Sequence, residues 1–370
     1  MPSLSSTKYG QLSWLETFGM FASVIPLPIS IIWSVVTSAY ASYNKTRSLK
    51  RIASDTIMRH MLGRLSVPQL QAIVGTTMTA YEKFCRANNL PLIIDELGED
   101  ARLLWLGPKR LEHVVLYIHG GGFILAPGDT ALEFWRRSQQ ELNKQNIEVS
   151  IVMLNYSLIP DASFPTPLRQ AALAIEFLIT AGVKPQNLQL VGDSAGGNLV
   201  LQVLSHMLHP LGSVPEIRLA TPLRGILLIS PWTTLSATNK PLSSYTENEG
   251  RDCVTQRIFS RWGALVLADV VQADRPFVEA VHAPDTWFEG ADTLVERVLI
   301  TGGGLEVLRD DIIAVGQSFQ RHHRGAELVV QEDGIHDDMF NELAVNERKC
   351  SLTPLIIGWL ATGFRTDNTN

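Results

Sequence analysis

Short apolar runs alternate with longer segments of helical periodicity from residue 113 to the C-terminus. Segments such as PTPLRQAALAIEFLITAG, with apolar positions at helical spacing, separate most of the runs. Buried runs that alternate with helices are typical of a parallel sheet with helices on both faces. The pattern therefore predicts an α/β fold with a mostly parallel central sheet, to which residues 93–107 are expected to add antiparallel edge strands. The apolar runs lie at residues 113–121, 148–156, 188–194, 225–232, 297–304 and 327–334.

Two parts of the chain depart from this alternation. Residues 1–90 are helical in pattern, for example in VPQLQAIVGTTMTAYEKFCRANN, and are predicted to form an N-terminal helical extension or cap. The longest interval between predicted strands, residues 233–296, contains Trp262 and Trp287. We interpret it as a cap insertion over the carboxyl edge of the sheet. Residues 91–370 are accordingly predicted to form the α/β domain.

An apolar segment lies within the extension, at residues 17–44. It holds no charged side chain, and four basic residues follow it between Lys45 and Arg51. A segment of this length is able to cross a bilayer, and the basic flank would keep its C-terminal side in the cytosol. Pro26 and Pro28 interrupt it, so a helical lid packed on its own domain is an equal alternative. A cleaved signal peptide fits less well, because Glu16 precedes the segment.

The composition of the chain indicates which partners it does not bind and in which cellular compartment it lies. The chain has 370 residues, 45% of them hydrophobic, and a net charge of −6 without a basic block of the kind that binds nucleic acid. Its three widely spaced cysteines indicate reduced thiols. No Cys-x-x-Cys or His-Glu-x-x-His motif occurs, so neither a metal nor another cofactor is expected. We expect an intracellular protein, cytosolic or attached to a membrane with its α/β domain facing the cytosol, and the oligomeric state stays open.

The segment VGDSAGGNLV sets Ser194 between Gly192 and Gly196, after an apolar run and before a helical segment. Strand and helix then meet with almost no room for a turn, and the two glycines let the backbones approach. Such a nucleophile elbow exposes the hydroxyl at a helix N-terminus, where free N–H groups and the helix dipole stabilise an oxyanion. An ordinary glycine-rich turn is the alternative.

The segment HGGGF follows the first predicted parallel strand. Its glycines let backbone N–H groups face a ligand without side-chain obstruction. The amides of Gly121, Gly122 and Ala195 are therefore predicted to form an oxyanion hole, with a phosphate nest or a plain turn as alternatives. Phe123, which ends this segment, and Trp232, which ends the run 225–232, are candidate substrate-binding residues.

A base and an acid follow the serine along the chain. His336 lies just after the last apolar run, on a loop at the same sheet edge, whereas the other histidines lie in the glycine loop, at a strand start, on helices or after no strand. Glu306, at the end of the penultimate strand, is the predicted acid. Asp310 and Asp311 stay open as alternatives, although their place in a first helical turn is typical of acids that complement the helix dipole. Ser194, Glu306 and His336 are the predicted catalytic residues.

Together these motifs resemble the hormone-sensitive-lipase branch of the α/β-hydrolases, the alpha/beta hydrolase fold-3 group, over residues 110–345. HGGGF and GDSAGGNL match closely, and NYSLIPDASFPTPLRQ, SPW and GGLEVLRDD are similar to further family segments. Two positions depart from the family pattern. The acid is Glu where many members carry Asp, and Asp337 stands where Gly is common, which makes the rim of the site more acidic. The N-terminal extension resembles that of fungal members that act on sterol esters or secondary metabolites.

The resemblance implies an α/β-hydrolase fold and acyl transfer. The expected activity is that of a carboxylic-ester hydrolase, acting through an acyl-enzyme on a small-to-medium apolar substrate. A secondary metabolite is one candidate substrate, and amide cleavage stays open. The alternative is a non-hydrolytic cyclase or dehydratase on the same scaffold in a natural-product pathway. A ligand-binding receptor, as the gibberellin receptor is on this fold, fits less well because that receptor lacks the base and His336 is present.

Overall fold

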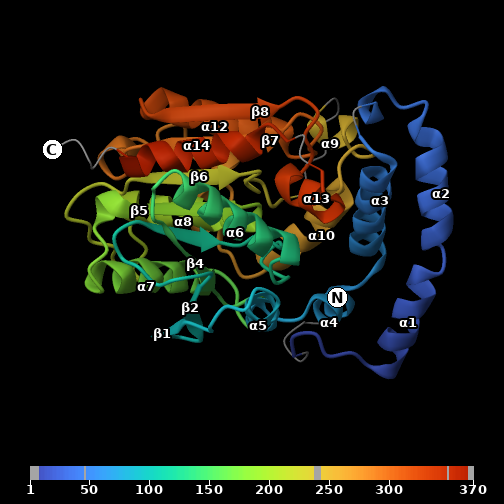
Figure 1. Cartoon of the computed structure of the whole chain (residues 1–370), viewed down its shortest axis with the longest axis horizontal. Helices are drawn as coiled ribbons and strands as arrows, with labels where there is room; N and C mark the ends of the chain where they lie inside the picture. The colour runs from blue at the N-terminus through green and yellow to red at the C-terminus, as the bar shows by residue number, and fades with distance from the viewer. Residues whose placement is uncertain (1–7, 46, 237–242, 348–349, 366–370) are drawn as a thin grey trace.

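A computed structural model describes residues 8–45, 47–236, 243–347 and 350–365. In these residues, one eight-stranded sheet runs through the molecule in the order β1-β2-β4-β3-β5-β6-β7-β8 (Figure 1). β2 pairs antiparallel with both β1 and β4, and the remaining neighbours are parallel. The predicted mostly parallel sheet with antiparallel edge strands is confirmed. The strands are β1 (Ile94–Gly98), β2 (Ala101–Trp105), β3 (Val114–Ile118), β4 (Ser150–Asn155), β5 (Leu188–Asp193), β6 (Gly225–Ile229), β7 (Val298–Gly303) and β8 (Ala326–Gln331).

Helices cover both faces of the sheet, which is why its central strands are apolar throughout. All five residues of β3 are buried, as expected of a strand without a solvent face. One face packs on α5 (Thr77–Ala87), α6 (Asp129–Lys144), α13 (Asp338–Val345) and α14 (Leu352–Arg365). The other face packs on α7 (Thr166–Thr180), α8 (Ala195–Leu208) and α12 (Arg309–His322).

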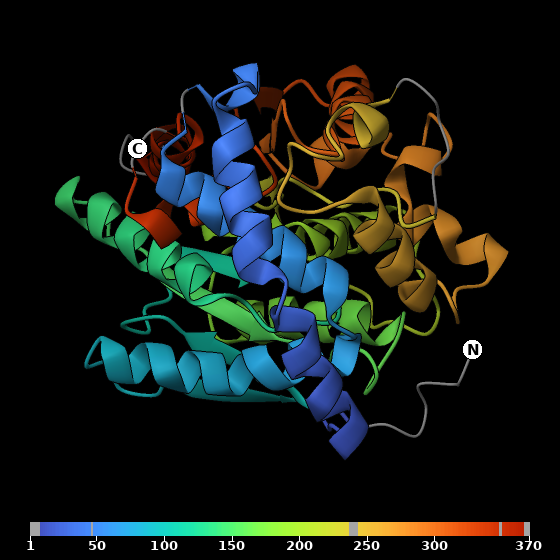
Figure 2. The same ribbon diagram turned by 90° about the vertical axis from the view of Figure 1, so that its right-hand side faces the viewer.

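The helices that precede the sheet gather at the carboxyl ends of its parallel strands. They are α1 (Trp14–Val24), α2 (Leu27–Ser38), α3 (Leu49–Arg64), α4 (Val67–Val74) and α5. Gly75, with a φ of +79°, ends α4 and divides a helical pattern that looks continuous in the sequence. α1 and α2 follow one another as a bent rod outside α3 and α4 (Figures 1 and 2). By length and composition alone, the stretch Trp14–Ser38 is able to cross a membrane.

The segment between β6 and β7 also contributes to this end of the molecule. It contains α9 (Ser244–Glu247), α10 (Gln256–Val266) and α11 (Arg275–Val278). α10 contacts α3, and α11 contacts α8, so the segment joins the N-terminal helices to the α/β layers. The division of the chain into a 1–90 extension, a 91–370 domain and a 233–296 cap insertion stays a prediction, and part of that insertion lies outside the described residues.

Candidate active site

Ser194 occupies the tight turn between β5 and α8. Its φ of +50° and ψ of −115° are strained for an L-residue, as is typical of a nucleophile elbow. A Cβ on Gly192 would lie 2.3 Å from the carbonyl oxygen of Gly196. A Cβ on Gly196 would lie 1.9 Å from the carbonyl oxygen of Ile118 on β3. The two glycines are therefore needed because three backbone segments meet at the serine.

The glycine loop after β3 turns backbone donors toward this site. Gly121 and Gly122 have φ values of +102° and +69°, which side chains rarely tolerate. Among the described residues, no hydrogen bond uses the N–H groups of Gly121, Gly122 or Ala195. These donors are therefore free to bind an oxyanion, and their role in an oxyanion hole stays a prediction.

His119, at the start of the glycine loop, links this loop to α5. Its Nδ1 donates to the carbonyl of Gly120 at 2.7 Å, so its Nε2 accepts from the Thr77 hydroxyl at 3.1 Å. The ring stacks on Tyr156, whose hydroxyl donates to the His119 carbonyl at 2.8 Å. Burial lowers the pKa of His119 to about 4, so the ring is neutral at physiological pH. It is a structural residue of the loop.

The three predicted catalytic side chains lie in one hydrogen-bonded row. Nε2 of His336 is 2.9 Å from Oγ of Ser194, and Nδ1 of His336 is 3.0 Å from Oε2 of Glu306. All three are buried, with exposed fractions of 5% for the serine, 6% for the histidine and 0% for the glutamate. Strands β5 and β7 and the loop after β8 thus bring together residues that are distant in the sequence.

The alternative acids point elsewhere. Asp310 accepts a hydrogen bond from the Ser244 amide at 2.8 Å, and Asp311 accepts from the Tyr245 hydroxyl at 2.7 Å. Both therefore join α12 to α9. Of these three described acids, Glu306 is the one in contact with His336.

Helix α10 covers the row of side chains. Phe259 sets its ring edge-to-face against the His336 ring, with centroids 5.5 Å apart. Trp262 lies so close to the glycine loop that a Cβ on Gly122 would be 2.4 Å from its ring. The cover is aromatic and leaves Ser194 and His336 buried, and such burial strengthens electrostatic interactions in the site.

The sequence around this site is similar to that of known α/β hydrolases. A model of the alpha/beta hydrolase fold family matches residues 115–340. The chain belongs to this family. A Schizosaccharomyces pombe protein assigned as a steryl acetyl hydrolase is 25% identical to this α/β hydrolase over 65% of its chain and 64% of the relative's. The hormone-sensitive lipase of Mus musculus is 30% identical over 39% of this chain and 20% of its own.

A solved structure agrees in fold. The crystal structure of an esterase from the bacterial hormone-sensitive lipase family has a TM-score of 0.62 to this α/β hydrolase, at 23% identity, and the match covers 87% of this chain and 99% of that one. The family model and the match to hormone-sensitive lipase confirm the resemblance to the hormone-sensitive-lipase-like branch. The matches to the two curated relatives each span less than two thirds of the relative's length.

Asp252, in the segment between β6 and β7, is a residue of the site that the sequence does not predict. Its Oδ1 accepts from the backbone N–H of His336 at 3.0 Å, and its Oδ2 accepts from the N–H of Val307 at 2.8 Å. One fully buried carboxylate therefore holds the loop of His336 and the loop that follows Glu306 at the same time. Nothing local in the sequence identifies it, because its partners are 84 and 55 residues away.

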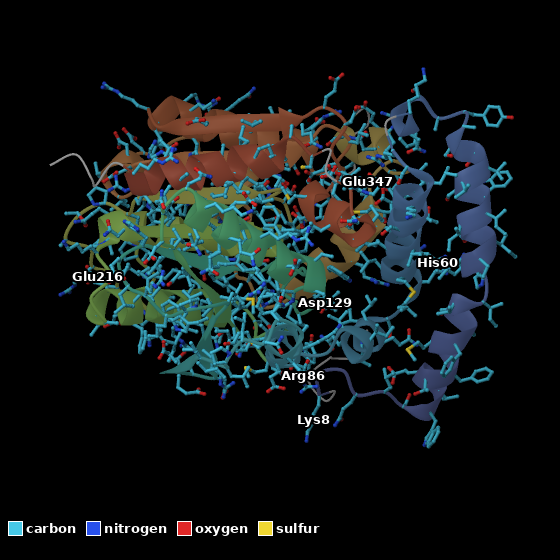
Figure 3. All side chains as sticks on the ribbon, in the orientation of Figure 1. Lys8, His60, Arg86, Asp129, Glu216 and Glu347 are labelled. Carbon is cyan, nitrogen blue, oxygen red and sulfur yellow. The ribbon has the colours of Figure 1, made fainter. Side chains whose placement is uncertain are left out.

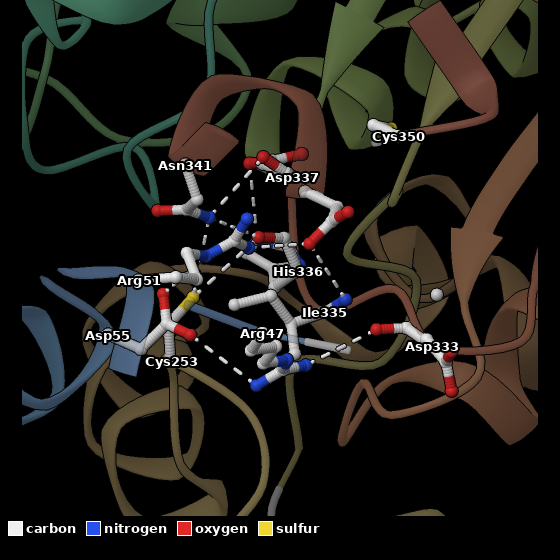
Figure 4. Close-up of polar contacts among 12 residues, drawn as sticks. Arg47, Arg51, Asp55, Cys253, Asp333, Ile335, His336, Asp337, Asn341 and Cys350 are labelled. Atoms are coloured by element: carbon white, nitrogen blue, oxygen red, sulfur yellow. Dashed lines mark hydrogen bonds and ion pairs between the residues drawn. The ribbon is translucent and has the colours of Figure 1, made fainter. Parts of the chain in front are cut away.

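The N-terminal helix α3 also supports the histidine loop. Arg51 is buried and donates to Asp55 at 2.8 Å and to Asp338 at 2.5 Å, two residues after His336 (Figure 4). Asn341, one turn further along α13, donates to the His336 carbonyl at 2.9 Å. Removing one partner of a buried ion pair usually costs about 3–5 kcal/mol, so α3 is integral to the site.

The two candidate substrate-binding residues lie at different places. Phe123 borders a small apolar cavity together with Phe164 and Val266. Trp232 is fully buried, and its backbone N–H donates to the carbonyl of Ser194 at 2.9 Å. The role of both in substrate binding stays a prediction. In the described residues, no cluster of three or more His, Cys, Asp or Glu is arranged to hold a metal ion.

Buried carboxyl groups surround His336. Burial by itself lowers the pKa of His336, but Asp337, Glu306 and Asp252 outweigh burial and raise it. Asp337 is the nearest to the serine side of the ring, with Oδ2 3.5 Å from Nε2. Burial in turn raises the pKa of Asp252 and of Asp193 to about 6, and that of Asp337 well above its ordinary value. The basicity of the histidine therefore depends on how many of these acids are ionised.

Replacing Asp337 by asparagine is expected to move the pH–rate profile to lower pH. The predicted base His336 must be neutral to accept a proton. The charge of Asp337, 3.5 Å away, raises the pKa of His336, so removing that charge lowers the pKa and keeps the ring neutral at lower pH. Asparagine tolerates the φ of +51° at this position, so the loop is expected to keep its shape. The measurement is kcat/KM for a short ester against pH. An acidic limb that stays in place or moves to higher pH would contradict the role given to Asp337.

Proposed function

We propose that this α/β hydrolase is a serine esterase with Ser194 as nucleophile, His336 as base and Glu306 as the group that orients the base. The observation that carries the proposal is the row of hydrogen bonds from Glu306 through His336 to Ser194, beside unused backbone donors of the glycine loop. Family membership supports it, because the similar proteins include a hormone-sensitive lipase and a bacterial esterase by name.

The proposed reaction has two half-reactions. Oγ of Ser194 attacks the ester carbonyl while Nε2 of His336 takes its proton, and the amides of Gly121, Gly122 and Ala195 bind the oxyanion. The C–O bond then breaks, and the imidazolium returns its proton to the leaving alcohol. Water attacks the acyl-enzyme with the same base, and the carboxylic acid and the free serine result.

The proposed substrate is an ester of an apolar alcohol with a short acyl group. The aromatic cover formed by Phe259 and Trp262 supports an apolar substrate. The name of the Schizosaccharomyces pombe relative, a steryl acetyl hydrolase, supports a short acyl group on a bulky apolar alcohol. A secondary metabolite of this chemistry is part of the proposal.

The proposed location is the cytosolic face of a membrane. The exposed apolar stretch Trp14–Ser38 supports attachment, because none of its most apolar window is buried against the protein. Exposed basic side chains follow at Lys45 and Lys50, which supports a cytosolic position for the α/β domain. One side of α2 packs on α3, as in a packed lid helix, and the other side faces solvent, where it is available for membrane contact.

A fluorophosphonate probe tests the catalytic proposal. The probe is expected to label Ser194 covalently and to abolish turnover of short p-nitrophenyl esters in parallel with labelling, because only an activated serine attacks it. Peptide mapping locates the label, and labelling of the heat-denatured protein is the control for non-specific reaction. A folded protein that is not labelled and does not turn over these esters would favour the non-hydrolytic alternative, in which the serine forms no covalent bond. Ester turnover that persists after full labelling would show that Ser194 is not the nucleophile.

A further inference from the structure

The rod formed by α1 and α2 exposes large apolar side chains along its whole outer side. Trp14 is 92% exposed, Ile29 is 72% exposed and Trp33 is 70% exposed. Within this stretch the one charged side chain is Glu16, whose carboxylate accepts from the N–H and hydroxyl of Ser13 at the start of α1. Soluble proteins rarely leave so long an apolar surface exposed without a partner. The other large exposed side chains here are Leu15, Phe18, Phe21, Val24, Ile25, Ile32 and Val36.

The inner side of the same rod is fixed to the protein by polar contacts. Nε2 of His60 on α3 donates to the carbonyl of Ser23 at 2.9 Å, and the amide of Gln69 on α4 donates to the carbonyl of Glu16 at 2.6 Å. Figure 3 places His60 between α3 and the rod. A helix that left the body to cross a bilayer would lose these contacts. The geometry therefore favours a rod that lies along a membrane surface with its outer side in the lipid.

A basic cavity opens between the rod and the helices beneath it. It has a volume of about 460 Å³ and is bordered by Ile29 and Trp33 on the apolar side. Arg59, Arg64 and Arg257 border it on the other side, together with His60. In the described part of the chain, none of these three arginines forms an ion pair.

The arginines of this cavity concentrate positive charge in a protein that is acidic overall. Arg261, one turn along α10 from Arg257, adds a further guanidinium, and its pKa is lowered by burial and by the charge of Arg257. The chain carries a net charge of −6, so this local excess is not a consequence of composition. Arg59 already donates to the carbonyl of Asp252 at 2.8 Å. Arg64 and Arg257, beside exposed aromatic and aliphatic side chains, therefore provide the guanidinium groups that match an anionic headgroup attached to acyl chains.

We propose that the outer side of the α1–α2 rod and the cavity of Arg59, Arg64 and Arg257 together form a docking surface for an anionic phospholipid bilayer. The net negative headgroup lies in the cavity, and the acyl chains lie against Ile29, Trp33 and the outer side of the rod. The inference rests on the membrane attachment proposed above and not on the catalytic assignment. It places α3 and α10, which also border the active site, on the side of the molecule that faces the bilayer.

Vesicle flotation of the full chain tests this surface without substrate. Vesicles of phosphatidylcholine containing about one third phosphatidylserine are compared with pure phosphatidylcholine vesicles at about 0.15 M salt. We expect binding to the anionic vesicles, weakened by salt, and a loss of at least about tenfold in affinity for Arg64→Glu/Arg257→Glu. Both arginines are exposed, so the fold should persist, and melting temperature verifies it.

The matched control is Arg218→Glu/Arg324→Glu, which changes the net charge by the same amount. Arg218 pairs with Glu216, which Figure 3 shows at the end of the molecule opposite the rod. Arg324 precedes β8 and so lies at the amino end of that strand, away from the carboxyl ends beside the N-terminal helices. The control is expected to bind anionic vesicles like the wild type, whereas Phe18→Ser/Phe21→Ser should bind both vesicle types less. Equal loss in the two charge-reversal variants, or equal binding to both vesicle types, would overturn the anion site. No binding to any vesicle would overturn the membrane attachment as well, and neither result would bear on esterase activity.

Discussion

Replacing Ser194 by alanine is expected to lower kcat/KM for short p-nitrophenyl esters by about 10⁴- to 10⁶-fold. The hydroxyl is the atom that His336 contacts at 2.9 Å, and no other described serine hydroxyl contacts that nitrogen. Alanine keeps the Cβ, so the strained backbone at φ +50° changes little and the melting temperature should stay within a few degrees. Residual turnover above the uncatalysed rate would come from substrate binding and the backbone donors.

Ser138→Ala is the matched control for this loss. Ser138 is also a buried serine, on α6, and its hydroxyl has no hydrogen-bond partner among the described residues. Its removal should leave turnover unchanged, which separates loss of the nucleophile from loss of a buried hydroxyl. A Ser194→Ala variant that turns over esters like the wild type would end the esterase proposal.

The fold was predictable because each of its signals is local. Runs such as VVLYI are apolar at every position, since strands covered on both faces have no polar side to show. The elbow was predictable for a similar reason, because the contacts that exclude a Cβ at Gly192 and Gly196 are made within one turn of chain and the neighbouring strand.

The support of the site was not predictable, because it comes from distant parts of the chain. Asp252 reaches backbone amides on two other loops, and Arg51 reaches Asp338 across 287 positions. Neither residue stands in a recognisable motif, and buried polar contacts of this kind depend on tertiary packing alone. The apolar segment 17–44 was ambiguous for a different reason. Its composition satisfies both a membrane contact and a packed helix, and in the structure one side of it is packed and the other is exposed.

Replacing Glu306 by glutamine is expected to lower kcat/KM by about 10³- to 10⁴-fold. Oε1 of Glu306 accepts from the Ser230 hydroxyl at 2.6 Å and from the Gly303 amide, and glutamine satisfies these donors by keeping its oxygen there. Its amide nitrogen then faces Nδ1 of His336 as a donor. The ring is forced to carry its proton on Nε2, where it cannot accept the proton of Ser194.

Asp310→Asn and Asp311→Asn are the controls that decide between the three acids. Both carboxylates accept hydrogen bonds from the α9 region and have no contact with His336, so either change should affect stability more than turnover. The comparison is kcat/KM of the three variants under conditions in which each is folded, as judged by melting temperature. A larger loss for either aspartate than for Glu306→Gln would transfer the orienting role to that aspartate. The reason for expecting the opposite is geometric: an acid orients an imidazole only through a direct hydrogen bond, and Glu306 makes that bond at 3.0 Å.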